Sequence, residues 1–121
     1  EVLANNIRQS IAKIFHAGGK IVVGTDSPFT PIGINTHNEL VQEVKAGLTP
    51  FEALRSATAV PAELLGEGQD LGTVEPGKIA DLVFVEGNPL EDIRDASKVR
   101  KVMKTGKLYT IEQLLTRDGA K

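Results

Sequence analysis

The chain has 121 residues, of which 40% are hydrophobic and 25% are charged, and its formal net charge is −2. This composition is typical of an ordinary folded domain, and its interspersed charges form neither a basic surface for nucleic acid nor a polybasic segment for a membrane. No apolar run approaches the roughly 20 residues that span a bilayer, and the absence of cysteine excludes disulfides and fits a reducing, cytoplasmic compartment. We therefore expect no nucleic-acid partner and no membrane association.

The first predicted element is an amphipathic helix over residues 2–16. Ile7, Ile11 and Ile14 recur at helical spacing, and two glycines follow at 18 and 19. His16 is expected in the last turn, where the helix dipole favours an imidazolium. A continuous Ile-Val-Val run at 21–23 then predicts a strand that is buried on both faces. We expect the helix to pack on the sheet to which this strand belongs.

Asp26 follows directly after this predicted strand. Polar groups just beyond the carboxyl ends of strands are where α/β folds usually place their chemistry, because the loops there converge on one pocket. Asp26 is therefore the leading candidate for a catalytic residue. A second interpretation stays open, because Asp-Ser-Pro at 26–28 is also an ordinary turn sequence, in which a carboxylate accepts hydrogen bonds from backbone amides.

A second helix is predicted to begin at Asn35 or Thr36 and to end at Gly47. His37 then lies in its first turn, close to the loop that carries Asp26. It is either an exposed or capping polar residue or a residue that contacts a ligand above the strand end. We assign His37 as a candidate substrate-binding residue.

Later elements have clear local signals. Thr49 and Glu52 form a capping box with proline at the first helical position, and a short helix over 61–65 is followed by Gly66. Beyond residue 70, Glu-Pro-Gly at 75–77 predicts a turn. Strands are expected at 82–85, at 98–105 and around 108–109, followed by a brief helix over 111–115. Helices followed by strands suggest two structural regions.

Several motifs occur in a specific order. They include Gly-Thr-Asp-Ser-Pro at 24–28, Ala-Gly-Leu-Thr-Pro at 46–50, Gly-Thr-Val-Glu-Pro-Gly-Lys-Ile-Ala-Asp-Leu-Val at 72–83 and Gly-Asn-Pro-Leu at 87–90. In this order and spacing the chain resembles the C-terminal third of an amidohydrolase-superfamily enzyme, closest to the imidazolonepropionase-like and prolidase-like metal-dependent hydrolases.

The resemblance implies an α/β fold. Residues 1–66 would supply the last strand and the closing helices of a (β/α)8 barrel, and residues 67–121 would supply strands of the small flanking β-sandwich and a C-terminal helix. It also implies that Asp26 is the aspartate that serves the metal centre, as a ligand and as the proton acceptor of catalysis. The complete enzyme would use Zn²⁺ or another divalent metal to hydrolyse C–N bonds in a small amide or peptide-like substrate. Asp81 is assigned to backbone hydrogen bonding in a turn or bulge.

The chain departs from this family in its metal ligands. The His-x-His pair and the other ligating residues are absent, and a barrel needs roughly 250 residues. We therefore expect a fragment, a truncated reading frame or one part of an assembly, which is inactive alone and holds no metal tightly. The alternative is a non-catalytic small α+β module that acts through self-association. In either case the apolar run at 21–23 lacks a partner strand, which predicts a homo-oligomer.

Overall fold

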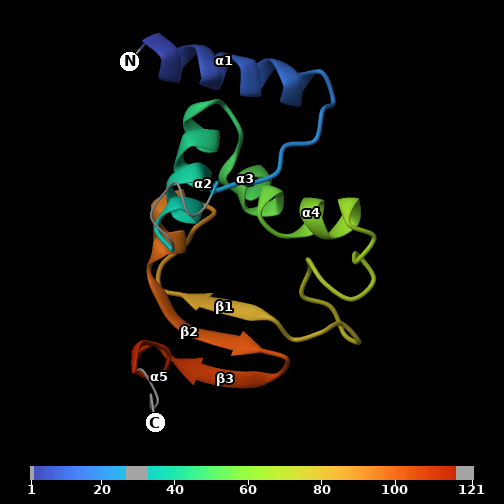
Figure 1. Ribbon diagram of the computed structural model, residues 1–121, viewed down its shortest axis with the longest axis vertical. Coiled ribbons are helices and arrows are strands. Elements are labelled where there is room, and N and C mark those ends of the chain that lie inside the picture. The colour runs from blue at the N-terminus through green and yellow to red at the C-terminus, as the bar shows by residue number, and fades with distance from the viewer. Residues whose placement is uncertain (1, 27–32, 117–121) are drawn as a thin grey trace.

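A computed structural model of the protein describes residues 2–26 and 33–116. The fold is mixed α/β, with the N-terminal helices in one half of the molecule and a small sheet, together with the short C-terminal helix, in the other (Figure 1). In chain order the elements are α1 (Val2–His16), α2 (Asn35–Lys45), α3 (Pro50–Ser56), α4 (Ala59–Leu64), β1 (Leu82–Val85), the 3₁₀-helix η1 (Ile93–Ser97), β2 (Val99–Lys104), β3 (Lys107–Thr110) and α5 (Ile111–Leu115).

The predicted helices are confirmed, but not every end follows its predicted signal: the residue before α2 is Ile34, which makes no side-chain cap, rather than Asn35 or Thr36. Helix α1 has the predicted bounds, with His16 in its last turn. Helix α3 begins with the predicted capping box, in which the Thr49 hydroxyl accepts from the Glu52 amide and the Glu52 carboxylate accepts from the Thr49 amide. Gly47, just beyond α2, has a φ of 110°, a conformation that glycine adopts without strain. Helix α4 begins at Ala59, two residues earlier than predicted.

The three predicted C-terminal strands form one antiparallel sheet in the order β1-β2-β3. Val83 pairs with Val102, which pairs with Tyr109. The β2–β3 turn consists of Thr105 and Gly106, whose φ values of 49° and 78° suit a tight hairpin turn that follows the strand twist. The turn at 75–77 is confirmed as well, because the Lys78 amide donates to the Glu75 carbonyl at 3.3 Å. The 3₁₀-helix η1 was not predicted.

A small apolar core holds the two halves together. It consists of Leu40 from α2, Ala53 from α3, and Ile93 and Ala96 from η1, and we call these four residues the central core. Partly buried hydrophobic residues, among them Val23, pack against it. Helix α2 therefore contacts both α3 and η1, and the central core contains residues from both sides of the boundary expected at 66/67. The division into two domains stays a prediction.

The strand predicted at 21–23 is not formed, and this prediction was wrong. Residues 19–26 belong to no strand or helix, and Val22 is 41% exposed instead of buried. The physical reason is that a strand exists only through hydrogen bonds to a neighbouring strand, and the three strands of the described sheet pair with one another.

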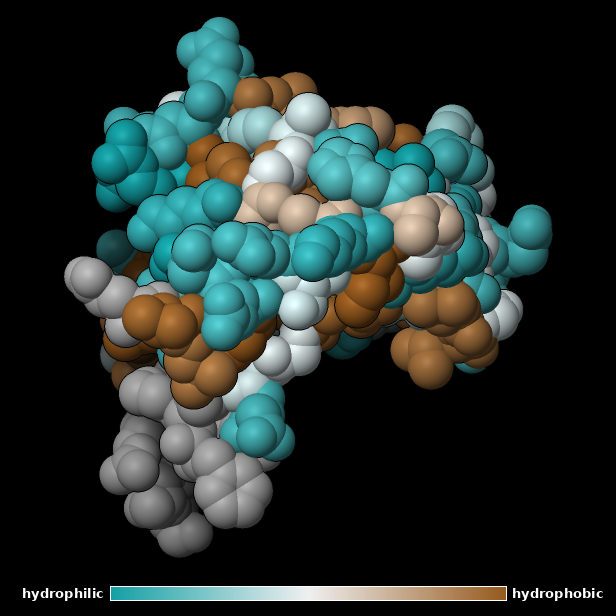
Figure 2. Space-filling view, turned by 90° about the horizontal axis from the view of Figure 1, so that it is seen from above, coloured by the Kyte–Doolittle hydropathy of each residue, from teal (hydrophilic) through white to brown (hydrophobic). Residues whose placement is uncertain are grey.

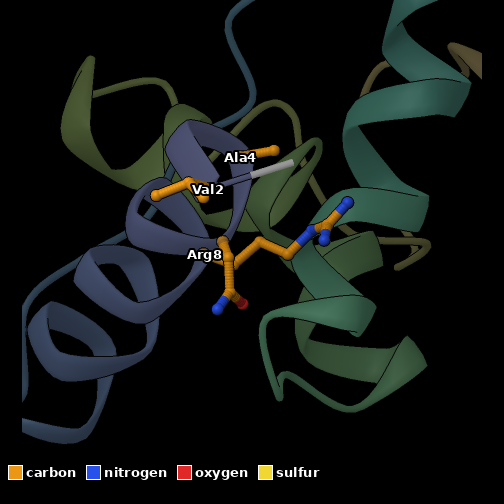
Figure 3. A pocket seen from close by; sticks show the side chains of 4 residues that line it. Val2, Ala4 and Arg8 are labelled. Atoms are coloured by element: carbon orange, nitrogen blue, oxygen red, sulfur yellow. The ribbon is translucent and has the colours of Figure 1, made fainter.

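The packing expected for α1 is also corrected, because α1 lies against α2 rather than on a sheet (Figure 1). No residue of α1 is buried. Arg8 extends toward α2 (Figure 3), where its Nη2 donates to Gln42 Oε1 at 2.7 Å. The apolar residues Val2, Leu3, Ile7 and Ile14 are all more than half exposed. Figure 2 shows such apolar residues at the surface between hydrophilic ones.

Within the described part of the chain, no helix is long and apolar enough to cross a membrane.

Candidate functional site

The segment that leads to Asp26 runs in an extended form beside α3. Its exposure alternates, so that Ile21, Val23 and Thr25 are half-buried while the residues between them are exposed. Val23 packs against the central core, and its amide donates to the Ser56 carbonyl at 3.2 Å. The period of two is that of a strand, so the segment keeps the side-chain alternation of a strand without its ladder of hydrogen bonds. It is exposed on one side, whereas the sequence predicted burial on both faces.

Asp26 is the last described residue of this segment and is exposed to solvent. Its φ of 48° lies in the left-handed region, which few residues other than glycine adopt, although aspartate does so more readily than most. Such outliers are often found at functional sites, where the surrounding structure holds them. The turn interpretation of residues 26–28 depends on residues 27 and 28, which lie outside the described residues.

His37 lies in the first turn of α2 and lines a cavity of about 630 Å³ between the helices and β1. The imidazole Nδ1 is buried and has no hydrogen-bond partner among the described residues. A buried polar atom without a partner costs free energy, so Nδ1 is a position where a ligand atom could bind favourably. The described lining of the cavity is mostly apolar and includes Leu40, Leu54, Leu65, Val74 and Val83.

The structure does not bring the two predicted site residues together through any described contact. Asp26 is not among the described residues that line the cavity around His37. No hydrogen bond or ion pair between Asp26 and His37 occurs in the described part of the chain. Their predicted roles therefore rest on separate observations. These are the exposed, left-handed position of Asp26 and the ring nitrogen of His37 that has no partner among the described residues.

Asp81 has the structural role that the sequence analysis assigned to it. Its Oδ1 accepts from the Thr105 amide at 2.7 Å, and its Oδ2 accepts from Lys104. The hydrogen bonds from Lys104 and from the Thr105 amide hold the pKa of Asp81 below its ordinary value. Asp81 thus ties the start of β1 to the turn between β2 and β3.

One buried polar pair was missed by the sequence analysis. Glu43 of α2 is 4% exposed and Ser56 of α3 is 2% exposed, and the Ser56 Oγ lies 2.5 Å from Glu43 Oε2. Glu43 follows Leu40 by three residues and therefore falls on the apolar face of α2. That spacing was the signal that could have identified it.

The described residues do not form a metal centre by themselves. Residues 2–26 and 33–116 contain no group of three or more His, Cys, Asp or Glu side chains placed to hold one ion. Asp26 has the right donor chemistry, because carboxylate oxygen is a common zinc ligand, but a structural zinc site needs four ligands and a catalytic one three. A metal bound at Asp26 would need ligands other than the described residues.

Comparison with known proteins relates nearly the whole chain to one family. Residues 3–109 match the family model described as the amidohydrolase family. Ochratoxinase from Aspergillus niger is 35% identical over 114 residues, which cover 90% of this chain and 23% of that protein. The chain thus spans about a quarter of the length of this relative.

Solved structures agree in fold as well as in sequence. A Xaa-Pro dipeptidase with methionine bound in its active site is 40% identical with a TM-score of 0.81, and the match covers 86% of this chain and 25% of the other. A prolidase from Bifidobacterium longum, described as putative, is 38% identical with a TM-score of 0.75, covering 82% of this chain and 25% of the other. Both matches support a prolidase-like fold for this part of the chain.

Proposed function

This chain belongs to the amidohydrolase family, with prolidase-like relatives, and we propose that it supplies the C-terminal part of a hydrolase that cleaves C–N bonds in small amide or peptide-like substrates. The observation that carries this proposal is the match over residues 3–109, which includes Asp26. The names of the relatives, a dipeptidase and a prolidase among them, are in keeping with this bond type. The barrel-fragment assignment of residues 1–66 and the sandwich assignment of residues 67–121 are part of the same proposal.

In this proposal Asp26 acts as a general base and then as a general acid. Its carboxylate accepts a proton from the water that attacks the scissile carbonyl carbon, and it returns that proton to the leaving amine nitrogen as the C–N bond breaks. Such proton transfer by a positioned side chain contributes about 10²–10⁴-fold to rate. The exposure of Asp26 leaves its carboxylate accessible to water and substrate.

We further propose that His37 binds substrate. Its Nδ1 lacks a partner among the described residues, and the mostly apolar cavity around it has the volume that small-molecule sites usually have. A substrate amide or carboxylate that pairs with this nitrogen would satisfy a buried polar atom. His37→Ala is therefore expected to raise KM more than it lowers kcat.

The proposed enzyme uses Zn²⁺ or another divalent ion, whose chemistry when bound is to polarise a carbonyl or a water molecule. Because the described residues do not complete a metal centre, we expect the 121-residue chain alone to show no measurable amide hydrolysis. After dialysis it should hold less than one zinc per chain. One tightly bound zinc per chain, together with hydrolysis that is lost in Asp26→Asn, would contradict this expectation.

The catalytic assignment is tested in the polypeptide translated from the complete reading frame that encodes these residues. Hydrolysis of dipeptides and N-acyl amino acids is measured with saturating divalent metal. Asp26→Asn keeps the shape of the side chain but cannot accept a proton, so kcat should fall by about 10²–10⁴-fold while thermal stability changes little.

Asp70→Asn is the matched control, because it makes the same chemical change at another exposed position. Its kcat should equal that of the wild type. If Asp26→Asn retained near-normal kcat, the proton-transfer role would be wrong and the turn interpretation would be favoured. If no hydrolysis of any C–N substrate occurred, the family function itself would have been lost, as the self-association alternative requires.

A further inference from the structure

The Ser56 hydroxyl oxygen makes two short contacts with other oxygens. If Glu43 is ionised, the Ser56 hydroxyl proton is the only proton available for both contacts. The Ser56 Oγ lies 2.5 Å from Glu43 Oε2 and 2.7 Å from the Ala53 carbonyl oxygen. Both distances lie within the range of O–H···O hydrogen bonds, the first at its short end. A hydroxyl carries only one proton, so Ser56 cannot donate a full, linear hydrogen bond to both oxygens at once.

A protonated Glu43 resolves this conflict. Its carboxylic acid donates to the Ser56 Oγ, and Ser56 then donates to the Ala53 carbonyl, so each short contact contains one proton. With an ionised Glu43, one of the two contacts would place two oxygen lone pairs against each other without a proton. At a site that excludes water almost completely, such a contact is unfavourable.

The same serine also holds the segment that leads to Asp26. The Ser56 carbonyl lies in the last turn of α3, where helix carbonyls lack partners within the helix, and it accepts from the Val23 amide. Ser56 therefore connects α2 through its side chain and the Asp26 segment through its backbone. Val23 in turn precedes Asp26 by three residues.

We propose that Glu43 is held as a neutral carboxylic acid at neutral pH and that, through Ser56, it is a positioning residue for the segment that carries Asp26. The proposed function is needed only for the claim that this positioning of the Asp26 segment matters for catalysis. The protonation state and the positioning of Val23 stand on the geometry of Glu43, Ser56 and Ala53.

The surroundings of Glu43 favour the neutral form. Burial is the main cause that raises the pKa of its carboxyl above the ordinary value of 4.5, the nearby Glu39 raises it further, and the hydrogen bond with Ser56 opposes them. The other charged groups on the elements packed around Glu43 are paired elsewhere or exposed. Arg8 donates to Gln42, and Arg55 and Lys20 pair with Glu63. Glu52 caps α3, Asp92 pairs with Arg94, Asp95 pairs with Lys98, and Asp26 and Lys45 are exposed.

This protonation has a defined effect on stability. Because the pKa of Glu43 is raised in the folded chain, its contribution is fully present below pH 4.5 and is lost as the pH rises through the folded pKa. Glu43→Gln cannot ionise, and its amide N–H can donate to the Ser56 Oγ in place of the acid proton. This variant should therefore not lose that contribution as the pH rises.

The test is urea unfolding of the 121-residue chain between pH 4.5 and 8. Glu43→Gln should match the wild type at the acidic end and have an equal or higher unfolding midpoint at pH 8. Glu91→Gln, the same change at an exposed position, should follow the wild-type profile. A Glu43→Gln chain that is less stable than the wild type at pH 7 would overturn the proposal, because it would show that an ionised Glu43 accepts from Ser56.

The positioning role has its own readout in hydrogen exchange of the Val23 amide. Glu43→Ala should lower its protection about fivefold, the equivalent of one ordinary hydrogen bond, and Glu43→Gln should restore it. Amides of β2 should change in neither variant. Unchanged Val23 protection in Glu43→Ala would refute the positioning role.

If Glu43→Ala does not fold, carboxyl ¹³C NMR of Glu43 in the wild type decides the protonation state directly. An ionised signal at pH 7 would overturn the proposal. None of these measurements uses activity, so they can fail or succeed independently of Asp26→Asn.

Discussion

The N-terminal region, residues 2–26, differs sharply in packing from the region of residues 33–116. All four residues of the central core come from the second region, and no residue of the first is buried. The first region is joined to the rest by the packing of Val23 against the central core and by polar links, which are the Arg8–Gln42 hydrogen bonds, the Val23–Ser56 backbone bond and the Lys20–Glu63 ion pair. Yet both regions contain elements with equally clear sequence patterns.

The difference shows that a segment with a clear apolar sequence pattern can form a helix whose apolar side chains stay exposed. Helix α1 has a regular apolar stripe and forms with the predicted bounds, but its Ile7 and Ile14 side chains are about half exposed. A helix satisfies its own backbone hydrogen bonds, so it can form at the surface. The apolar run at 21–23 cannot satisfy its backbone in this way, and it is not a strand.

The largest expected difference between the two regions is in the free energy of unfolding that is lost when an isoleucine is replaced by alanine. Ile93 is 6% exposed and belongs to the central core, whereas Ile7 is 52% exposed. Ile93→Ala should lower the free energy of unfolding by about 3 kcal/mol, because it leaves a cavity. Ile7→Ala should change it by less than about 0.5 kcal/mol. Urea unfolding measures both, and equal losses would show that α1 is buried in solution.

A second comparison uses two glycines with similar backbone conformations. Gly72 and Gly18 have φ values of 93° and 83°, so alanine at either position costs about 1 kcal/mol in strain. At Gly72 the added Cβ would also lie 2.8 Å from Ala62 Cβ and 3.0 Å from Ala59 Cα, whereas at Gly18 it would meet nothing within 4 Å. Gly72→Ala should therefore cost about 2 kcal/mol more. Thermal unfolding of the pair measures this difference, and equal melting temperatures would mean that α4 moves away without cost.

The α3 capping box should have a smaller effect, of about 1 kcal/mol for Thr49→Ala. Thr49→Ser keeps the oxygen and is the control. The pKa of Glu52 is lowered by hydrogen bonds from the Thr49 backbone and side chain, so this stability is present above pH 4.5 and lost as the pH falls. The stability contribution of Glu52 thus changes with pH in the opposite direction to that of Glu43. If Thr49→Ala lowered the free energy of unfolding by the same amount at pH 3 and at pH 7, the Glu52 carboxylate would not contribute to the stability of the capping box.

The smallest effect on unfolding is expected for Ile14→Ser on the exposed face of α1, at less than about 0.5 kcal/mol. Its effect on assembly should be clear, because we expect a dimer in which a second copy covers the apolar N-terminal region. Light scattering at micromolar concentration should show the wild type as a dimer and Ile14→Ser as more monomeric. A monodisperse wild-type monomer would contradict the expected self-association.

Much of the fold could be predicted because its signals are local. The apolar period of residues 2–16, the Thr49–Glu52 box and the strand pattern at 82–85 each correspond to an element of the structure. The 3₁₀-helix η1 was missed because its start depends on Asp92, whose side chain accepts from the Arg94 amide. Such a short cap is common in turns as well and does not identify a helix.

The sequence alone determined the helices, the hairpin, the family and Asp26 as the candidate residue, because these depend on residues near one another in the chain and on motif order. Tertiary structure decided the rest. Whether residues 21–23 form a strand depends on a neighbouring strand, and the roles of Glu43 and His37 depend on residues that fold against them, Ser56 from α3 and the cavity lining beside β1. Burial, which raises the pKa of a carboxyl and makes a polar atom without a hydrogen-bond partner unfavourable, is a property of these distant neighbours.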